Sequence, residues 1–255
     1  MNPFVALCHT YARSFFLQTL WNFERLQNVG FAFSMAPLLG QLDHSKTAFR
    51  KLLRRQLLFF NTHPYFAPIV MGVVYAKEKA RTGGVEDEDQ TLTVLKDSMG
   101  GAFGAVGDHV IWGTWRPFAA VVALSTGILV AEPSRSWQVC AQWWVAGFLC
   151  MFNAVHLWLR WRGLQKAVQE GPGVVRWVES LHLQGWAAQL RRMGLFLLAV
   201  LVLVYLGRSS SSNLLLWMVG VLLGAIVLKR WSLSGFAIFY LVIAVAMALS
   251  SFGVR

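Results

Sequence analysis

Before residue 60, apolar and polar positions recur at the spacing of an α-helix. Residues 14–31 place polar side chains, among them Asn22 and Arg25, along one stripe and apolar side chains along another, which predicts an amphipathic helix. A second amphipathic helix is predicted over residues 45–60, with Asp43 as a candidate cap. Its basic face would suit either the cytoplasmic surface of a membrane, which we favour, or an acidic partner.

A different pattern follows between residues 59 and 131. Residues 59–68 are apolar but contain Pro64 and Pro68, so a re-entrant or interfacial hairpin is expected there instead of a simple span. Residues 99–131 are apolar and rich in glycine, as a membrane-embedded segment would be. Glycines let helices approach closely, or let a helix break where it lines a site.

Five apolar stretches occupy the rest of the chain: 117–131, 137–159, 193–207, 214–228 and 233–252. The second and the last are long enough to cross a bilayer, which takes about 20 residues. The shorter ones would reach only about 22 Å as helices. We expect these to form half-spans or to thin the bilayer locally.

Composition agrees with this pattern. The chain of 255 residues is 56% hydrophobic and 14% charged, whereas soluble domains average about 25% charged residues. We predict an all-α, polytopic integral membrane protein with cytoplasmic amphipathic helices and re-entrant or broken segments. It would have two regions: residues 1–98, which are amphipathic or re-entrant, and residues 99–255, which hold the glycine-rich motif and the transmembrane helices.

The net charge of +11 suits cytoplasmic loops and anionic lipid headgroups better than nucleic acid, because the basic residues interleave with the apolar stretches. Six of them fall in the predicted loop of residues 160–192, against one each in 132–136 and 207–213. If each stretch crosses once, the N-terminus is cytoplasmic and the C-terminus outside.

Three ionisable residues lie in the glycine-rich segment: Asp108, His109 and Arg116. Because a charge in hydrocarbon is costly, such groups usually line a polar cavity or face a partner. This combination is more typical of a transport site than of a structural span.

No pattern indicates chemistry performed by this chain alone. The six histidines and three cysteines lack the spacing of metal ligands. No nucleophile–base set or phosphate-binding loop is present. We therefore expect no catalytic residue, no metal site and no cofactor.

Several motifs, in this order, carry a resemblance to a known family: RSFFLQ at 13–18, WNFERLQNVGF at 21–31, FFNTHPY at 59–65, GAVGD at 104–108 and WGTWRP at 112–117. A weaker match runs from Asn153 to the C-terminus. The chain resembles the IID membrane component of the mannose/fructose/sorbose-type sugar phosphotransferase system. Two positions depart from the family pattern, which has proline where this chain has Gly101 and His109.

The resemblance implies the partners and the setting. A IID chain pairs with a IIC chain, usually as repeated heterodimers, in the bacterial inner membrane. The sugar crosses and is phosphorylated at the cytoplasmic face by a phosphohistidine of a IIB protein, which is charged through IIA from phosphoenolpyruvate. The IID chain carries no phosphohistidine itself.

Candidate contact residues fall into two groups. The polar and aromatic side chains of the last three motifs would contact the sugar, although turn capping, interface packing and headgroup contacts explain such residues too; they are Asn61, His63, Asp108, Trp112 and Arg116. The polar side chains of the second motif would contact IIC; they are Asn22, Glu24, Arg25 and Gln27.

Two other functions stay open at this point. The departures at Gly101 and His109 would fit a non-catalytic membrane scaffold that descends from such a subunit. Asp108 and His109 could also form the relay of a proton- or ion-coupled transporter.

Overall fold

The computed structural model describes residues 2–42, 45–82, 89–130 and 137–208. The chain divides into two compact units, residues 1–197 and 198–255, and the fold below is that of the first. Among the helices in the described ranges, none combines the length and the apolar character that a bilayer crossing requires. The apolar stretches predicted at 214–228 and 233–252 lie outside the described residues.

The secondary structure of the described residues is helical, apart from isolated β-bridges, so the all-α prediction is confirmed for them. The α-helices are α1 (Pro3–Arg13), α2 (Asn28–Leu39), α3 (Lys46–Gln56), α4 (Ala67–Thr82), α5 (Asp89–Gly107), α6 (Arg116–Val130), α7 (Trp137–Glu170), α8 (Val174–Ser180) and α9 (Leu183–Arg208). Shorter helical turns are η1 (Ser14–Phe16) and η3 (Gly171–Gly173), both 3₁₀, and the π-helical η2 (Asp108–Trp115).

The helix predicted over residues 14–31 is wrong. The chain turns between η1 and the start of α2 at Asn28. Within this stretch Asn22 and Leu26 exchange backbone hydrogen bonds of 3.1 and 2.9 Å, and Leu26 has a φ of 53°. A residue in the left-handed region cannot continue a right-handed helix. The predicted polar stripe is therefore part of a folded loop.

The second amphipathic helix exists, but α3 is shorter than the predicted 45–60. Ser45 caps it, because its Oγ accepts the backbone N–H of Ala48 at 3.2 Å. The candidate cap Asp43 lies outside the described residues. One side of α3 packs against α2, and its basic residues lie on the exposed side.

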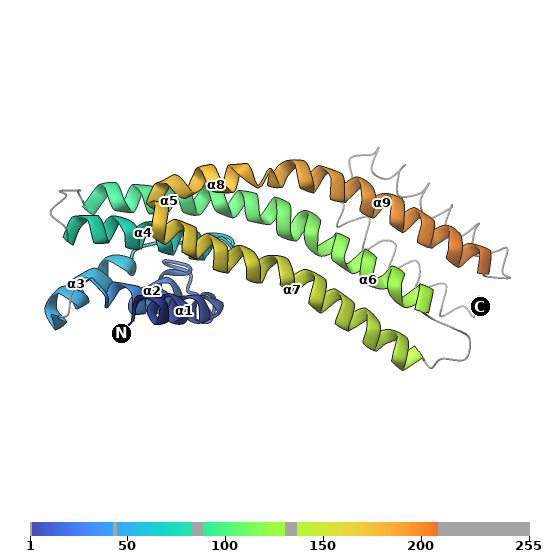
Figure 1. Ribbon diagram of the computed structural model, residues 1–255, viewed down its shortest axis with the longest axis horizontal. Coiled ribbons are helices and arrows are strands. Elements are labelled where there is room, and N and C mark those ends of the chain that lie inside the picture. The colour runs from blue at the N-terminus through green and yellow to red at the C-terminus, as the bar shows by residue number, and fades with distance from the viewer. Residues whose placement is uncertain (1, 43–44, 83–88, 131–136, 209–255) are drawn as a thin grey trace. The chain divides into compact units, whose positions relative to one another are not determined.

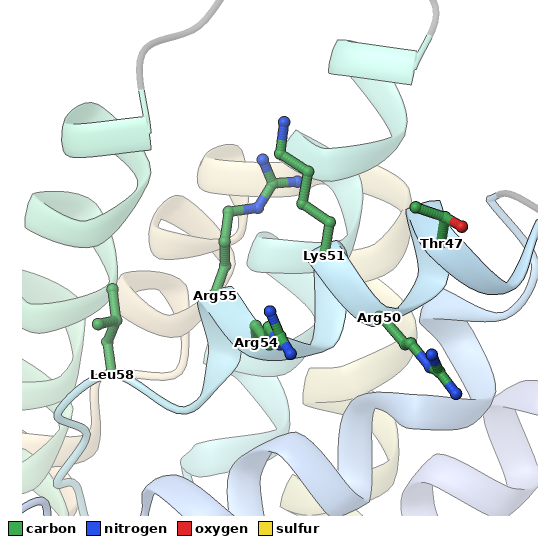
Figure 2. A pocket seen from close by; sticks show the side chains of 6 residues that line it. All are labelled: Thr47, Arg50, Lys51, Arg54, Arg55 and Leu58. Atoms are coloured by element: carbon green, nitrogen blue, oxygen red, sulfur yellow. The ribbon is translucent and has the colours of Figure 1, made fainter.

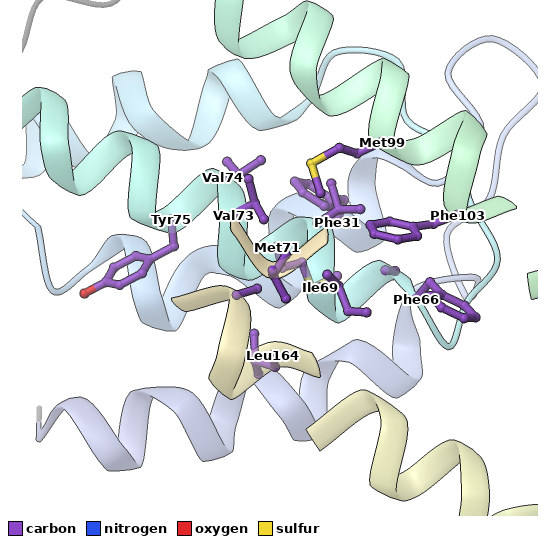
Figure 3. Packing of buried hydrophobic residues seen from close by; sticks show 14 of the residues in the cluster. Phe31, Phe66, Ile69, Met71, Val73, Val74, Tyr75, Met99, Phe103 and Leu164 are labelled. Atoms are coloured by element: carbon purple, nitrogen blue, oxygen red, sulfur yellow. The ribbon is translucent and has the colours of Figure 1, made fainter. Parts of the chain in front are cut away.

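The hairpin predicted over residues 59–68 is also wrong. Residues 59–63 are extended, a turn covers 64–66, and α4 begins at Ala67. The first turns of α4 have no exposed side chain and form the centre of the core: Ala67, Ile69, Val70, Met71, Val73 and Val74. Figure 3 shows these side chains among residues of α2, α5 and α7.

The loop predicted over residues 160–192 is helical, and this prediction is corrected too. It forms the end of α7, then η3, α8 and the start of α9. The high charge of this segment hid buried positions such as Leu164 and Ala167. α7 runs beside α4 and α6 (Figure 1). It approaches α4 closely, since a Cβ on Gly163 would lie 2.5 Å from Cγ1 of Ile69.

Residues 89–130 form one helical run, from α5 through η2 to α6. In η2 the hydroxyl of Thr114 donates to the carbonyl oxygen of His109 at 3.0 Å, five residues earlier. A π-helical segment widens the helix and turns side chains away from their usual register, and such segments are frequent at functional sites. The glycine-rich motif thus changes the helix geometry without ending the helix.

Candidate functional site

The extended segment before α4 is held by the start of α2. Gln27 is 2% exposed, and its side-chain amide makes both hydrogen bonds of a peptide group. Its Nε2 donates to the carbonyl oxygen of Thr62 at 2.8 Å, and its Oε1 accepts the Thr62 N–H at 3.1 Å. Its backbone N–H donates to the carbonyl oxygen of Phe60 at 2.9 Å. Gln27 therefore fixes the backbone that presents His63.

His63 lies between the extended segment and η2. It is 2% exposed, and its ring centroid is 4.8 Å from that of Trp112 and 4.9 Å from that of Tyr65. Gly107 faces it so closely that an added Cβ would lie 2.3 Å from Cβ and Cγ of His63. The Nδ1 atom accepts the backbone N–H of Tyr65 at 3.3 Å, whereas Nε2 has no hydrogen-bond partner among the described residues.

The other predicted sugar contacts are exposed at the surface. Trp112 is 44% exposed, and Asn61, Asp108 and Arg116 are exposed as well. Asp108 and Arg116 form no ion pair with each other or with any other described residue. The structure thus brings His63 and Trp112 into contact and leaves the remaining three side chains available to something outside this chain.

Three residues beside the site did not figure among the predicted contacts. The ring of Tyr65 stacks on that of His156 at 4.3 Å, and the guanidinium of Arg160 lies 5.0 Å from the Tyr65 ring. His156 Nε2 is 2.6 Å from Oδ1 of Asn153. The sequence could have indicated His156 as a candidate, because it is an ionisable residue within an apolar stretch, as Asp108 is. Its contact with Tyr65 exists only in the folded chain.

The predicted partner-contact residues divide into internal and exposed ones. Asn22 closes the loop before α2, because its Nδ2 donates to Oδ1 of Asn28 at 2.8 Å and its Oδ1 accepts the Arg25 N–H at 2.8 Å. Gln27 is engaged inside the chain, as described above. Glu24 and Arg25 are exposed and form an ion pair of 3.3 Å with each other. Contact of these residues with IIC stays a prediction.

A buried cation lies behind the extended segment. Lys96 of α5 is 3% exposed, and its Nζ donates to the carbonyl oxygen of Gln56 at 3.3 Å. The ammonium also lies 4.5 Å from the ring of Phe31 and 5.3 Å from that of Phe60. Burial lowers the pKa of Lys96 to about 8, against a smaller raising effect of the Asp97 carboxylate.

In the described part of the chain, no three of the His, Cys, Asp and Glu side chains gather closely enough to hold a metal ion. The arrangement instead offers an aromatic ring and polar side chains at a surface, supported by a buried histidine. Such a combination can bind a polar ligand with an apolar face, or a partner chain.

Comparison with known proteins gives the family. The family model for the PTS system mannose/fructose/sorbose family IID component matches residues 5–214. The mannose-specific EIID component of Escherichia coli (strain K12) is 34% identical over 193 residues, which are 75% of this chain and 65% of that protein. The sorbose-specific EIID component of Klebsiella pneumoniae is 32% identical over 198 residues, 77% of this chain and 68% of that protein. The alignment with the E. coli relative thus spans slightly less than two thirds of that protein's length.

Two solved structures share the fold. One, described as a membrane protein, has a TM-score of 0.70 and 26% sequence identity, and covers 98% of this chain and 97% of that chain. The other is a chain of the mannose transporter ManYZ in complex with microcin E492. It has a TM-score of 0.58 and 24% identity, and covers 99% of this chain and 98% of that chain. With a family match over most of its length, the chain belongs to the IID components of the mannose/fructose/sorbose phosphotransferase system.

Proposed function

We propose that this chain is the IID membrane subunit of a sugar permease and acts together with a IIC chain. The pair translocates a sugar whose crossing is coupled to phosphorylation, with the phosphoryl group supplied by IIA and IIB proteins. Membership in the family supports the proposal, and so do relatives whose names specify mannose, sorbose and fructose.

One contact within this chain supports the proposal independently of the family. The motif at residues 59–65 lies far in the sequence from those at 104–108 and 112–117, but it packs against them through His63, Gly107 and Trp112. In this arrangement His63 is a positioning residue that supports Trp112. The exposed ring of Trp112 offers an apolar face of the kind that sugar rings stack on. Asp108 and Arg116 lie four residues before and after it on the same helical run.

The two departures from the family pattern leave this packing undisturbed. A Cβ at Gly101 would meet no atom within 4 Å. His109 is exposed, and its Nε2 lies 3.3 Å from NH1 of Arg191 on α9. Both positions lie outside the contact between His63 and Trp112. This supports a transporting subunit over a scaffold that has lost its substrate.

We further propose that the chain is a multi-pass protein of the bacterial inner membrane, with its N-terminus in the cytoplasm. The excess of basic residues at 160–192 supports this orientation. A reporter inserted near Lys166 should be active inside the cell, and one fused after Arg255 should be active outside. If both reporters are active on the same side, the proposed number of crossings is wrong.

The function is tested in membranes that contain this chain, its IIC partner, IIB and IIA. Phosphoenolpyruvate should drive sugar phosphorylation, and the product should accumulate as sugar phosphate. A scaffold would give no phosphorylation, and an ion-coupled carrier would accumulate unmodified sugar.

The role of the site is tested in the same membranes with Trp112→Ala. We expect normal assembly with IIC and a loss of sugar uptake of about tenfold, which corresponds to about 1.4 kcal/mol of binding. Trp186→Ala is the matched control, because Trp186 is also an exposed tryptophan but lies on α9. Equal uptake in the two variants would remove Trp112 from the proposed site.

A further inference from the structure

The exposed side of α3 forms a basic hollow. Its volume is about 560 Å³. The basic side chains that line it extend from successive turns of the helix (Figure 2). The residues that line it, called here the α3 basic surface, are Thr47, Arg50, Lys51, Arg54, Arg55 and Leu58.

The described residues compensate the charge of this surface only in part. Arg55 donates to the buried carboxylate of Glu78 at 2.7 Å, and Gln56 donates to the other oxygen of the same carboxylate at 3.3 Å. These bonds anchor α3 to α4. In contrast, Arg50, Lys51 and Arg54 form no ion pair with any described residue. Three like charges within two helical turns repel one another, so an anionic ligand would stabilise this surface.

The packing of α3 favours a protein over a bilayer as the source of that anion. A helix that lies on a membrane inserts its apolar face among the acyl chains. In α3 this face is already used, because Leu52 and Gln56 are buried and Phe49 packs against the core. One exposed apolar side chain, Leu58, lines the hollow, and Phe59, which follows it in the chain, is exposed as well. Arginines beside apolar and aromatic side chains are typical of protein interfaces.

We infer that the α3 basic surface docks an acidic protein that carries a phosphoryl group. Guanidinium groups suit this task, because they bind phosphoryl oxygens in a forked geometry and keep their charge at any physiological pH. Arg50 and Arg54 are four residues apart on α3 and so lie on one face. The inference rests on the proposed function, in which the phosphorylated protein is the IIB carrier that delivers its phosphoryl group to the sugar.

The test uses the full-length chain in complex with its IIC partner, in proteoliposomes, and phosphorylated IIB as the probe. The variant R50Q/K51Q/R54Q removes three exposed cations and keeps the Arg55–Glu78 anchor. The control R162Q/R176Q/R192Q removes three exposed cations from α7, α8 and α9, so both variants change the net charge equally. The thermal unfolding midpoint of each complex confirms that both variants fold.

We expect the KM for phosphorylated IIB to rise at least fivefold in the α3 variant and to stay within twofold in the control. The difference should vanish at saturating IIB, and the KM of the α3 variant should respond less to salt, because charges at an interface chiefly accelerate association. Equal KM values in the α3 variant and the control would overturn the inference. So would a rise in KM that occurs in proteoliposomes with phosphatidylglycerol and is absent in those of neutral lipid, since the surface would then act through lipid.

The proposed function can fail separately. If the wild-type complex does not phosphorylate sugar at all, binding of phosphorylated IIB to the complex is measured directly. Binding that is lost in R50Q/K51Q/R54Q and kept in the control would uphold the docking surface without the transport function. Binding that is absent, or the same in both variants, would overturn it.

Discussion

At the scale of single residues, the site depends on which side-chain volumes fit between η2 and the segment before α4. Gly107 and Gly101 lie on the same helix, α5, yet their surroundings are opposite. At Gly107 a Cβ would enter the ring of His63, whereas at Gly101 it would point into open space. The same substitution at the two positions therefore separates packing from helix propensity.

We expect Gly107→Ala to destabilise the protein by about 1–3 kcal/mol, because His63 must move away from Trp112 to make room. Gly101→Ala should be neutral or should stabilise it by up to about 1 kcal/mol, since alanine favours an exposed helix interior. Thermal unfolding of the purified complex measures both changes. An equal effect of the two substitutions would contradict the close packing at His63.

Asp108 is a second position where the surroundings of the side chain decide how a substitution affects stability. Its side chain is exposed, and no hydrogen bond or ion pair joins it to a described residue. Asp108→Asn should therefore change the stability of the chain by no more than about 0.5 kcal/mol. A loss of uptake in this variant would report a contact outside the chain, either with the sugar or with IIC. A fall in thermal stability that matches the fall in uptake would indicate a structural role instead.

At the scale of elements, an extended segment is fixed by a side chain in addition to its backbone hydrogen bonds with residues 25–27. The amide of Gln27 takes the place of a peptide group and pairs with Thr62. This explains why residues 59–63 can remain extended inside an all-helical fold, since buried backbone groups require partners. It also gives Gln27 an internal role in addition to any contact with IIC.

Gln27→Leu keeps a similar volume but leaves the N–H and the carbonyl of Thr62 without partners. Each unsatisfied buried group is worth about 1–3 kcal/mol, so we expect a destabilisation of at least about 2 kcal/mol and a low yield of the complex. The control is Glu170→Gln, which alters only a solvent-exposed ion pair with Lys166 and should leave yield and unfolding midpoint unchanged. Equal yields and equal unfolding midpoints of the two variants would contradict the role of the Gln27 side chain in holding Thr62.

At the scale of the whole molecule, a buried lysine lies where α2, α3 and α5 meet. The folded state lowers the pKa of Lys96 to about 8, whereas an unfolded lysine titrates near 10.4. Between these values the unfolded chain holds a proton that the folded chain has released. Stability contributed by this group therefore rises with pH through that window, and the penalty of burying the charge is fully present below about pH 8.

Lys96→Met should remove this dependence, because methionine fills similar space without a charge. From pH 7 to pH 10 we expect the wild type to gain about 2 kcal/mol relative to the variant. The variant should be the more stable protein at pH 7. The unfolding midpoints of the wild-type and variant complexes across this range give the difference in stability at each pH. Titratable groups that both proteins share cancel in this difference. A constant difference at all pH values would show that Lys96 does not titrate in the window.

The sequence alone determined the helical class of the described residues, because apolar residues recur at helical spacing and that signal is local. It also determined the family, because short motifs keep their order over nearly the whole chain. These features require no knowledge of which segments meet.

Tertiary structure decided the rest. The polar stripe at 18–25 belongs to a loop, because Leu26 adopts a left-handed backbone and pairs with Asn22. The charged segment 160–192 is helical, because its apolar residues are buried in the core, with Leu164 and Ala167 packed against Gly72 of α4. His63 meets Trp112, and Tyr65 meets His156, across dozens of residues of sequence. Such contacts depend on how side-chain volumes fit between packed helices. The sequence pattern gives the spacing of residues along one helix, but it does not give the shape of the helix that packs against it.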